Sequence, residues 1–216
     1  LFVKVYFNMS NFEFTTNWFK LNGKQVWDAL LPKLKPSKVL EIGSYEGEST
    51  CYLINYLSKK ENNELYCIDN WTGAVEQKNR GINMEEVEKR FDNNVKIAMN
   101  ESSNSIKFTK LKGNSDINLS KLLLDKKINY FDFIYVDGSH QAPDVLFDAV
   151  MAFKLLRKNG IIAFDDYLWF EKNLPHGKDL NRCPKPAIDA FTSIFYNKVT
   201  IIQAPLKQLY VTKISD

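Results

Sequence analysis

Cysteine is scarce in this chain, which has only Cys51, Cys67 and Cys183 among its 216 residues. The number is odd, and no pair has the CxxC spacing of a redox or zinc-binding motif. Two of the three lie in apolar segments, where a thiol behaves as a small hydrophobic group. The sequence therefore predicts reduced cysteines without a disulfide framework, and a cytoplasmic protein.

Long apolar runs and blocks of one charge are also lacking. The apolar opening LFVKVYF is interrupted by Lys4, is far too short to cross a bilayer, and is not followed by a small-residue cleavage site. The net charge of +3 comes from interleaved signs, so we expect neither a nucleic-acid nor a membrane partner. The most basic segment, IKFTKLKG, carries Lys107, Lys110 and Lys112, a pattern typical of a protected edge strand.

The hydrophobic pattern predicts a single domain over residues 1–216. With 44% hydrophobic residues the chain can bury one substantial core. From Lys38 onward, short apolar runs alternate with amphipathic segments, which predicts βαβ units around a mostly parallel sheet. The expected strands are 38–44, 64–71, 106–112, 130–138, 160–166, 198–204 and 208–214. The expected helices are 47–59, 84–99, 116–126, 142–157 and 186–196.

The last part of this pattern sets the expected topology. Basic residues followed by Gly in Lys158-Asn159-Gly160 predict the end of the helix over 142–157. Only residues 205–207 separate the last two strands, so these should form an antiparallel hairpin. The predicted fold class is α/β: a doubly wound, Rossmann-like, seven-stranded and mostly parallel sheet with a C-terminal antiparallel hairpin.

Residues 1–37 precede the first βα unit and predict a helical, aromatic cap on the catalytic sheet of residues 38–216. The aromatic residues of this cap are Phe12, Phe14, Trp18, Phe19 and Trp27. They either pack on the helices of the sheet or line the mouth of a site. Packing is the expected role for most of them.

The turn EIGSYEGEST after the first strand lacks the third Gly of a dinucleotide fingerprint. Only Gly43 and Gly47 are present. A dinucleotide turn needs all the glycines of G-x-G-x-x-G to bring the backbone close to a pyrophosphate at a helix N-terminus. Glu46 and Glu48 next to the helix start would repel such an anion. Acidic residues here, Glu41 and Glu46 included, suit a ligand with a positive centre and free hydroxyls, such as a sulfonium with an amino-acid tail and a ribose.

These residues resemble the first motif of the class I S-adenosylmethionine-dependent methyltransferases, commonly written E-x-G-x-G-x-G. Tyr45 stands at the middle Gly, a departure that is similar to the variant E-I-G-S-x-E-G-x-S-T of a subgroup of small bacterial methyltransferases. The resemblance implies S-adenosylmethionine as the cofactor. The implied contacts are Glu41, Gly43, Ser44 and Gly47 around the methionine part, Asp69 at the ribose, Asn114 and Ser115 near the adenine, and also Ser49, Asn70 and Asp137.

Asp69 points to a ligand independently of that resemblance. It ends the second expected strand, and ligands of open α/β sheets bind at the carboxyl ends of strands. The alternative is that Asp69 caps a turn with Asn70. Its place after Gly43 and Gly47 favours ribose binding.

Three further carboxylates end the fourth and fifth strands: Asp137 in YVDGSH, and Asp165 with Asp166 in AFDDY. Neighbouring strands would gather them at one edge of the sheet, where like charges are costly without a cation. Carboxylate oxygens suit a hard ion such as Mg²⁺, which makes all three candidate metal ligands. Alternatively, the acidic pair caps the following segment, or these residues contact only the cofactor or substrate.

His140 follows Asp137 by three residues. The ordinary pKa of a histidine side chain lies close to neutral pH, which suits a general base. The arrangement resembles catechol-type and macrolide-type O-methyltransferases, in which a base follows the first metal-binding Asp by three residues. Asp137 and His140 are thus the candidate catalytic residues. Two alternatives stay open: His140 orients the substrate only, or it stabilises its own loop. His176 has no partner motif and is expected at the surface.

The predicted function is methyl transfer from S-adenosylmethionine, with possible Mg²⁺ assistance, to a hydroxyl of a small molecule or glycan. The aromatic segment 167–170 and the loop 173–186 are expected to cover the acceptor, and 71–86 to form another wall. A nicotinamide-dependent oxidoreductase is the main alternative, and a non-catalytic methyltransferase-like binding domain is another. A homo-oligomer is compatible with the sequence.

Overall fold

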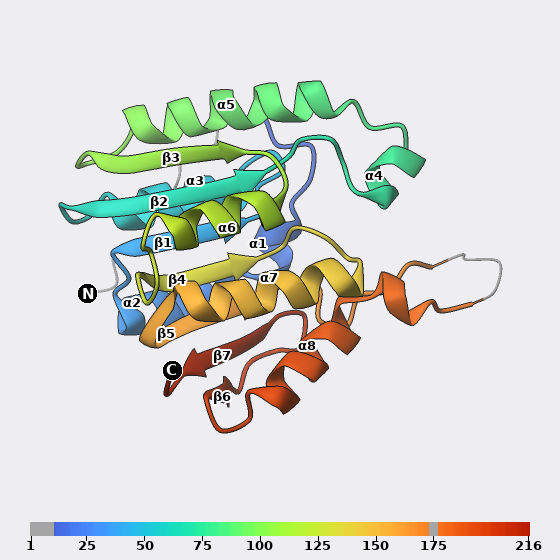
Figure 1. Cartoon of the computed structure of the whole chain (residues 1–216). Helices are drawn as coiled ribbons and strands as arrows, with labels where there is room; N and C mark the ends of the chain where they lie inside the picture. The colour runs from blue at the N-terminus through green and yellow to red at the C-terminus, as the bar shows by residue number, and fades with distance from the viewer. Residues whose placement is uncertain (1–10, 173–176) are drawn as a thin grey trace.

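The structure, a computed structural model, describes residues 11–172 and 177–216. A seven-stranded sheet in the order β3-β2-β1-β4-β5-β7-β6 forms its centre (Figure 1). The strands are β1 (Lys38–Ile42), β2 (Asn63–Asp69), β3 (Ile106–Lys112), β4 (Phe131–Val136), β5 (Leu156–Phe164), β6 (Val199–Ile202) and β7 (Leu209–Lys213). The first five are parallel. The expected α/β fold is confirmed.

The predicted terminal hairpin is present, with β6 and β7 antiparallel. The later strand, β7, lies between β5 and β6 and is antiparallel to both. At the opposite edge of the sheet lies β3, which carries the three lysines of the basic segment. That placement confirms β3 as the lysine-bearing edge strand.

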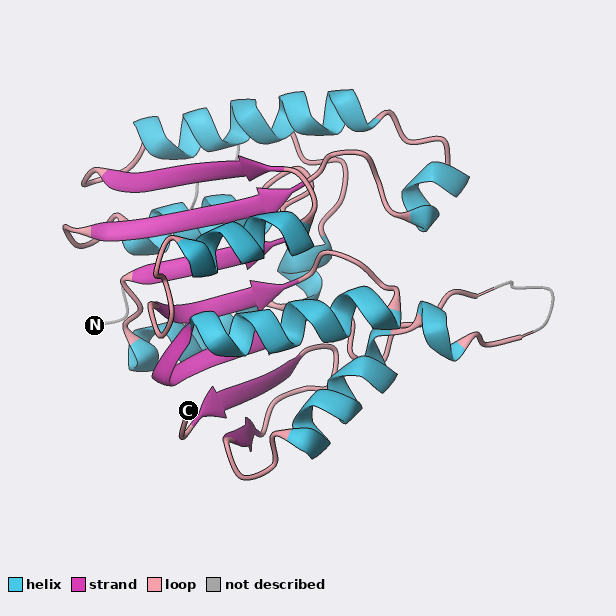
Figure 2. Ribbon diagram, in the orientation of Figure 1, coloured by secondary structure: helices cyan, strands magenta, loops and turns pink. Residues whose placement is uncertain are grey.

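Helices cover both faces of the sheet, as Figure 2 shows. One face packs against α6 (Ser115–Leu124), α7 (Ala142–Leu155) and α8 (Pro184–Ile194). The other packs against α1 (Trp18–Asn22), α2 (Lys24–Leu34), α3 (Glu48–Leu57) and α5 (Met84–Asn100). Two short helices, α4 (Val75–Asn79) and η2 (Leu180–Arg182), lie in connections. None of the described helices is long and apolar enough to cross a membrane.

The predicted end of α7 at Lys158-Asn159-Gly160 is wrong. The helix ends at Leu155, and β5 begins at the next residue. The backbone N–H groups of Asn129 and Tyr130, just before β4, bond the carbonyls of Lys154 and Leu155 at 3.0 and 2.7 Å. Tertiary hydrogen bonds therefore end the helix before the Gly signal is reached.

The N-terminal segment is part of the core over its helical residues. Trp27 is fully buried and packs edge-on against Phe133 and Tyr135 of β4, with ring centroids at 5.1 and 4.8 Å. It also contacts Phe19 of α1 at 4.7 Å. The packing role predicted for the cap thus holds for Trp27. The single-domain assignment over residues 1–216 stays a prediction, because residues 1–10 lie outside the described residues.

We predict that Trp27→Ala lowers the free energy of unfolding by about 3–5 kcal/mol, the usual cost of removing a buried aromatic. Leu21→Ala is a control from the same segment, since Leu21 is 63% exposed, and should change stability by at most about 0.5 kcal/mol. Urea denaturation measures both. Equal effects of the two substitutions would show that the N-terminal helices are not docked on β4.

Candidate active site

A cavity of about 810 Å³ opens at the carboxyl ends of the parallel strands. Its walls come from the loops after β1, β2, β3 and β4, together with Asp166 after β5. Eight of the predicted cofactor contacts line it: Gly43, Ser44, Ser49, Asp69, Asn70, Asn114, Ser115 and Asp137. Residues far apart in the sequence are therefore gathered in one site at the expected edge of the sheet.

The loop after β1 keeps a glycine-like path despite its missing glycine. Gly43 and Gly47 have φ of 87° and 84°, and Tyr45 at the middle position has φ of 48°. All three lie in the left-handed region that favours Gly. Tyr45 therefore adopts the left-handed backbone conformation that this position requires.

Glu41 lies beneath this loop and is fully buried. Its carboxylate accepts hydrogen bonds from the hydroxyls of Ser44 at 2.7 Å, Ser49 at 2.5 Å and Thr50, and from the thiol of Cys67. Burial raises the pKa of Glu41, while these hydrogen bonds act in the opposite direction. We predicted that Glu41 surrounds the methionine part, but it does not line the cavity. Glu41 instead holds the loop in place through its hydrogen bonds to Ser44 and Ser49.

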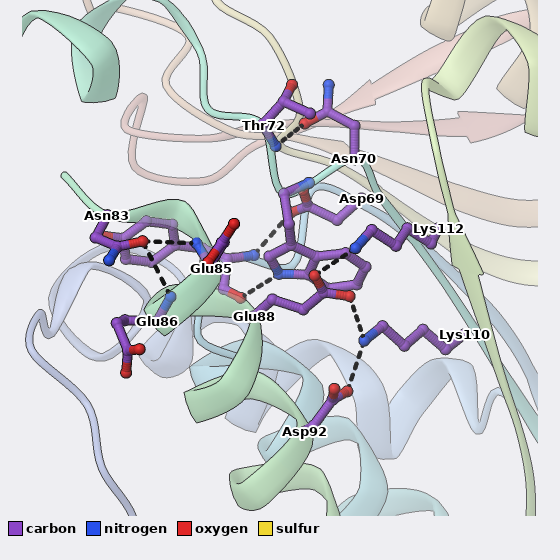
Figure 3. A network of polar contacts seen from close by, with 12 residues as sticks. Asp69, Asn70, Thr72, Asn83, Glu85, Glu86, Glu88, Asp92, Lys110 and Lys112 are labelled. Carbon is purple, nitrogen blue, oxygen red and sulfur yellow. Dashed lines mark hydrogen bonds and ion pairs between the residues drawn. The ribbon is translucent and has the colours of Figure 1, made fainter. Parts of the chain in front are cut away.

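Asp69, at the end of β2, holds the loop from the side. Its Oδ2 accepts from the backbone N–H of Ser44 and of Tyr45, both at 2.9 Å. Its Oδ1 accepts from the backbone N–H of Trp71 at 2.8 Å (Figure 3). Asp69 therefore caps a turn, which was the alternative to ligand binding, and it also lines the cavity. Because a carboxylate has about four acceptor positions, Oδ1 keeps room for one more donor.

Residues at the edge of the sheet support this loop, and Figure 3 shows Lys110 and Lys112 directed at the carboxylates of α5. The Trp71 indole donates to the carbonyl of Tyr45 at 3.0 Å. Lys110 lies 4.3 Å from the Trp71 ring and bonds Glu88 and Asp92 of α5 at 2.9 and 2.7 Å. The edge lysine therefore belongs to a structural network of carboxylates and an aromatic ring.

Glu46 is not the free negative charge that the sequence suggested. It is 2% exposed and accepts from Arg90 Nε at 2.7 Å. The backbone N–H and hydroxyl of Thr15 also donate to it, at 2.6 and 2.7 Å. Its charge ties the N-terminal segment to α5, so it is compensated before any ligand arrives.

Asp137 and Asp165 meet at the hydroxyl of Tyr135. That hydroxyl lies 3.0 Å from Asp137 Oδ2 and 2.5 Å from Asp165 Oδ2. Burial, followed by the charges of Asp165 and Asp166, raises the pKa of Asp137 well above its usual range. Burial and then Asp166 raise the pKa of Asp165 to about 6. The predicted gathering of carboxylates is present, and it creates the demand for a compensating cation or proton.

His140 faces the acidic pair. Its Nε2 lies 2.9 Å from Asp166 Oδ2, and its ring stacks on Trp169 with centroids 4.0 Å apart. Asp137, His140 and Asp166 offer ligand atoms within 4.8 Å of one another. Asp165 is outside this group, because its oxygens accept from Tyr135 and from the backbone N–H of Asp166. The structure thus pairs His140, rather than Asp165, with the other two candidate ligands.

The outer walls of the cavity include some of the segments that the sequence predicted. Phe14, Trp18 and Phe19 of the N-terminal segment line the cavity, as do residues 72–75 after β2. Of the segment 167–170, Trp169 reaches the site through His140. His176 and the rest of 173–176 lie outside the described residues.

Two site residues were missed by the sequence analysis. Tyr135 precedes Asp137 by two residues on a strand, so alternation would have placed both on one face. Asp148 lies on α7 one turn after Val145, on the same buried face as Ala149 and Ala152. A charged residue on an apolar helix face was the available signal.

We predict that Gly43→Ala lowers the free energy of unfolding by about 3 kcal/mol or more. An added Cβ would lie 2.0 Å from the carbonyl oxygen of Asp137, where the backbone leaves no room. Gly81→Ala is the matched control: Gly81 also has positive φ, 65°, yet no described atom lies within 4 Å of an added Cβ. It should cost only the backbone strain, about 1–2 kcal/mol. Chemical denaturation distinguishes them, and equal losses would refute the close approach.

Comparison with known proteins gives a consistent result. The chain is 26% identical over 170 residues to a probable caffeoyl-CoA O-methyltransferase 3 of Dictyostelium discoideum, covering 77% of this chain and 59% of that protein. It therefore spans less than two thirds of the length of this curated relative.

Solved structures share the fold. The O-methyltransferase TomG of Streptomyces achromogenes, involved in tomaymycin synthesis and solved with S-adenosylmethionine, has a TM-score of 0.61 at 17% identity, covering 88% of this chain and 79% of its own. An O-methyltransferase of Bacillus cereus in complex with S-adenosylhomocysteine has a TM-score of 0.60 at 16% identity, with 89% and 81% covered. The family described as "Methyltransferase domain" matches residues 40–167. The chain therefore belongs to this methyltransferase family.

Proposed function

We propose that this protein transfers a methyl group from S-adenosylmethionine to a hydroxyl of a small molecule. The observation that carries the proposal is the shared cavity. The loop of Gly43 and Ser44, anchored by Asp69, lines the same space as Asp137, His140 and Asp166. A cofactor held by the loop would therefore lie beside the groups that can orient and deprotonate an acceptor.

The residues present fit such a cofactor. S-adenosylmethionine, when bound, supplies an electrophilic methyl on a positively charged sulfur. Ser44 and Ser49 line the part of the cavity proposed for its amino-acid end, and Asp69 keeps acceptor capacity for a ribose hydroxyl. Glu41 and Asp69 hold the loop rigid before binding, which reduces the ordering cost of association.

His140 is the proposed general base. Asp166 holds Nε2, and Trp169 covers one face of the ring, so the imidazole has one orientation. A base that is already oriented loses less conformational entropy when it accepts the proton of the acceptor hydroxyl. The stacked indole also keeps water from that face of the ring.

The same cluster fits a divalent cation. Asp137 and Asp166 offer carboxylate oxygens to such an ion, and His140, which belongs to the same group, would act beside it as the base. Mg²⁺, when bound, would lower the pKa of an acceptor hydroxyl. Asp137, with its high pKa, and Asp166 would be its carboxylate ligands, while Tyr135 holds Asp137 in place.

The acceptor class is argued from the walls. Aromatic residues Phe14, Trp18 and Phe19 suit a flat or apolar acceptor such as a phenol. The relative from Dictyostelium discoideum carries a name that includes caffeoyl-CoA, which favours a phenolic acceptor for this chain as well. A glycan acceptor, a homo-oligomer and a cytoplasmic location stay predictions.

A nicotinamide-dependent oxidoreductase fits the site less well. A pyrophosphate needs free backbone N–H groups at the turn, whereas the N–H groups of Ser44 and Tyr45 are already bonded to Asp69. A non-catalytic binding domain does not account for an oriented His140 beside Asp166.

We predict that S-adenosylhomocysteine binds the protein and raises its melting temperature, because a ligand selective for the folded state stabilises it. Asp69→Asn should weaken binding by about 1–3 kcal/mol, the range for an unpaired buried polar group. Titration calorimetry measures the affinity, and the melting temperature of the unliganded variant reports the separate loss of loop anchoring. Binding of NAD but not of S-adenosylhomocysteine would overturn the proposed function.

A further prediction separates the base from the ion. His140→Ala should lower the rate of methyl transfer to a catechol by about 10²–10⁴-fold, the usual share of general acid–base catalysis. Asp166→Asn should also lower it, since it removes both the partner of His140 and a candidate ligand. Neither change should alter affinity for S-adenosylhomocysteine, because neither residue holds the loop after β1.

Turnover is then compared in EDTA and in Mg²⁺. Loss of turnover in EDTA, restored by Mg²⁺, is the result expected if Asp137 and Asp166 hold the ion. Equal turnover in the two buffers would assign Asp166 to His140 alone. A fully active His140→Ala enzyme would remove the base from the mechanism.

A further inference from the structure

Asp148 of α7 is a buried carboxylate that the mechanism above does not use. It is 1% exposed, yet it is among the residues that line the cavity. The Ser115 side chain lies near enough to lower its pKa. Its Oδ1 has no hydrogen-bond partner among the described residues. One acceptor oxygen therefore lies buried at the cavity wall without a donor.

The charges around Asp148 do not compensate it. Burial raises its pKa to about 7, the polar side chain of Ser115 acts in the opposite direction, and the carboxylates of Asp144 on α7 and Asp116 on α6 raise it further. A buried oxygen left unpaired costs stability. Such a position is retained more easily when a ligand supplies the missing donor.

The neighbours of Asp148 place it at one particular part of the cavity. Ser115 begins α6 directly after Asn114, whose side chain accepts from Asn70 at 3.0 Å. Gly138, after β4, is also close, since a Cβ added there would lie 3.7 Å from Asp148 Oδ2. In the proposed function this is the part nearest the nucleobase, since Asn70 follows the ribose-side Asp69.

We propose that Asp148 determines nucleobase specificity by accepting, at Oδ1, a hydrogen bond from the exocyclic amine of the adenine. This inference rests on the proposed function, because it assigns one contact within the same cofactor site. The exocyclic amine is the only N–H donor on the adenine of the cofactor, whereas the ring nitrogens N1, N3 and N7 are acceptors. An ionised carboxylate therefore accepts from the amine alone.

A hypoxanthine base provides the matched probe. It carries a carbonyl oxygen in place of the amine, and that oxygen would face Asp148 acceptor to acceptor. Sites built around a specific polar contact discriminate strongly against the analogue that lacks it, because their buried groups stay unpaired. Wild-type protein should therefore bind S-adenosylhomocysteine at least about tenfold more tightly than S-inosylhomocysteine.

The experiment compares both compounds by titration calorimetry on wild type, Asp148→Asn and Asp125→Asn. Asp148→Asn keeps the size of the side chain and can offer an amide N–H to the carbonyl, so the preference should fall at least fivefold or reverse. Asp125→Asn removes an exposed carboxylate at the end of α6 and should keep the wild-type preference. Melting temperatures of the unliganded variants establish that each is folded.

The pH dependence gives a second readout. Bonding to the amine favours the ionised carboxylate and lowers its pKa in the complex, so wild-type affinity should rise between pH 6 and pH 8. Asp148→Asn should lack this rise. A wild-type affinity that falls over the same range would mean that protonated Asp148 donates to a ring nitrogen, and would overturn the proposal.

The remaining outcomes are equally decisive. If wild type binds S-adenosylhomocysteine but Asp148→Asn keeps the full preference, the inference is wrong and the proposed function stands. If wild type binds neither compound, the proposed function fails and the inference fails with it. A folded Asp148→Asn protein with reduced preference and unchanged control supports both.

Discussion

The close approach of Gly43 to the backbone of Asp137 joins the two halves of the site. The space that a Cβ would need at Gly43 is taken by the Asp137 carbonyl. Two backbone hydrogen bonds hold this contact: Asp137 N–H donates to the carbonyl of Ile42 at 2.7 Å, and Gly43 N–H donates to that of Ile68 at 2.8 Å. The loop proposed for the cofactor and the acidic loop after β4 are therefore built against each other. Any larger residue at position 43 would separate them.

The carboxylates of the site divide by how many donors the protein gives them. Glu41 has four donors and Asp69 has three backbone N–H groups, so both serve as anchors of the first loop. Asp137 shares a single hydroxyl with Asp165, and Asp148 keeps an unpaired oxygen. Unsatisfied carboxylates, rather than carboxylates in general, are the groups that have chemistry left to offer a ligand.

The sequence predicted the framework well, because strand alternation and strand-end positions are local signals. The parallel order of β1 to β5, the hairpin and the meeting of Asp137, Asp165 and Asp166 all follow from which residues end which strands. The sequence did not predict those features that depend on a contact with a residue far away in the chain. The end of α7 depends on Tyr130, the charge of Glu46 on Arg90, and the direction of Asp165 on Tyr135. None of these pairings has a local pattern in the sequence.

This division is compatible with the proposed function, in which one acidic cavity holds a cationic cofactor and also accepts a proton. Arg90 pairs with Glu46, and hydrogen bonds satisfy Glu41 and Asp69, which makes the loop side of the cavity rigid. The carboxylates that lack such compensation, Asp137 and Asp166, lie on the side of His140, where burial and like charges raise the pKa of Asp137. A positive sulfonium, a metal ion or a developing imidazolium would each be stabilised on that side, because each would supply the positive charge that the crowded carboxylates lack. Without the partners of Glu41, Glu46 and Asp69, the like charges that already raise the pKa values of Asp137 and Asp165 would extend to the loop side of the cavity.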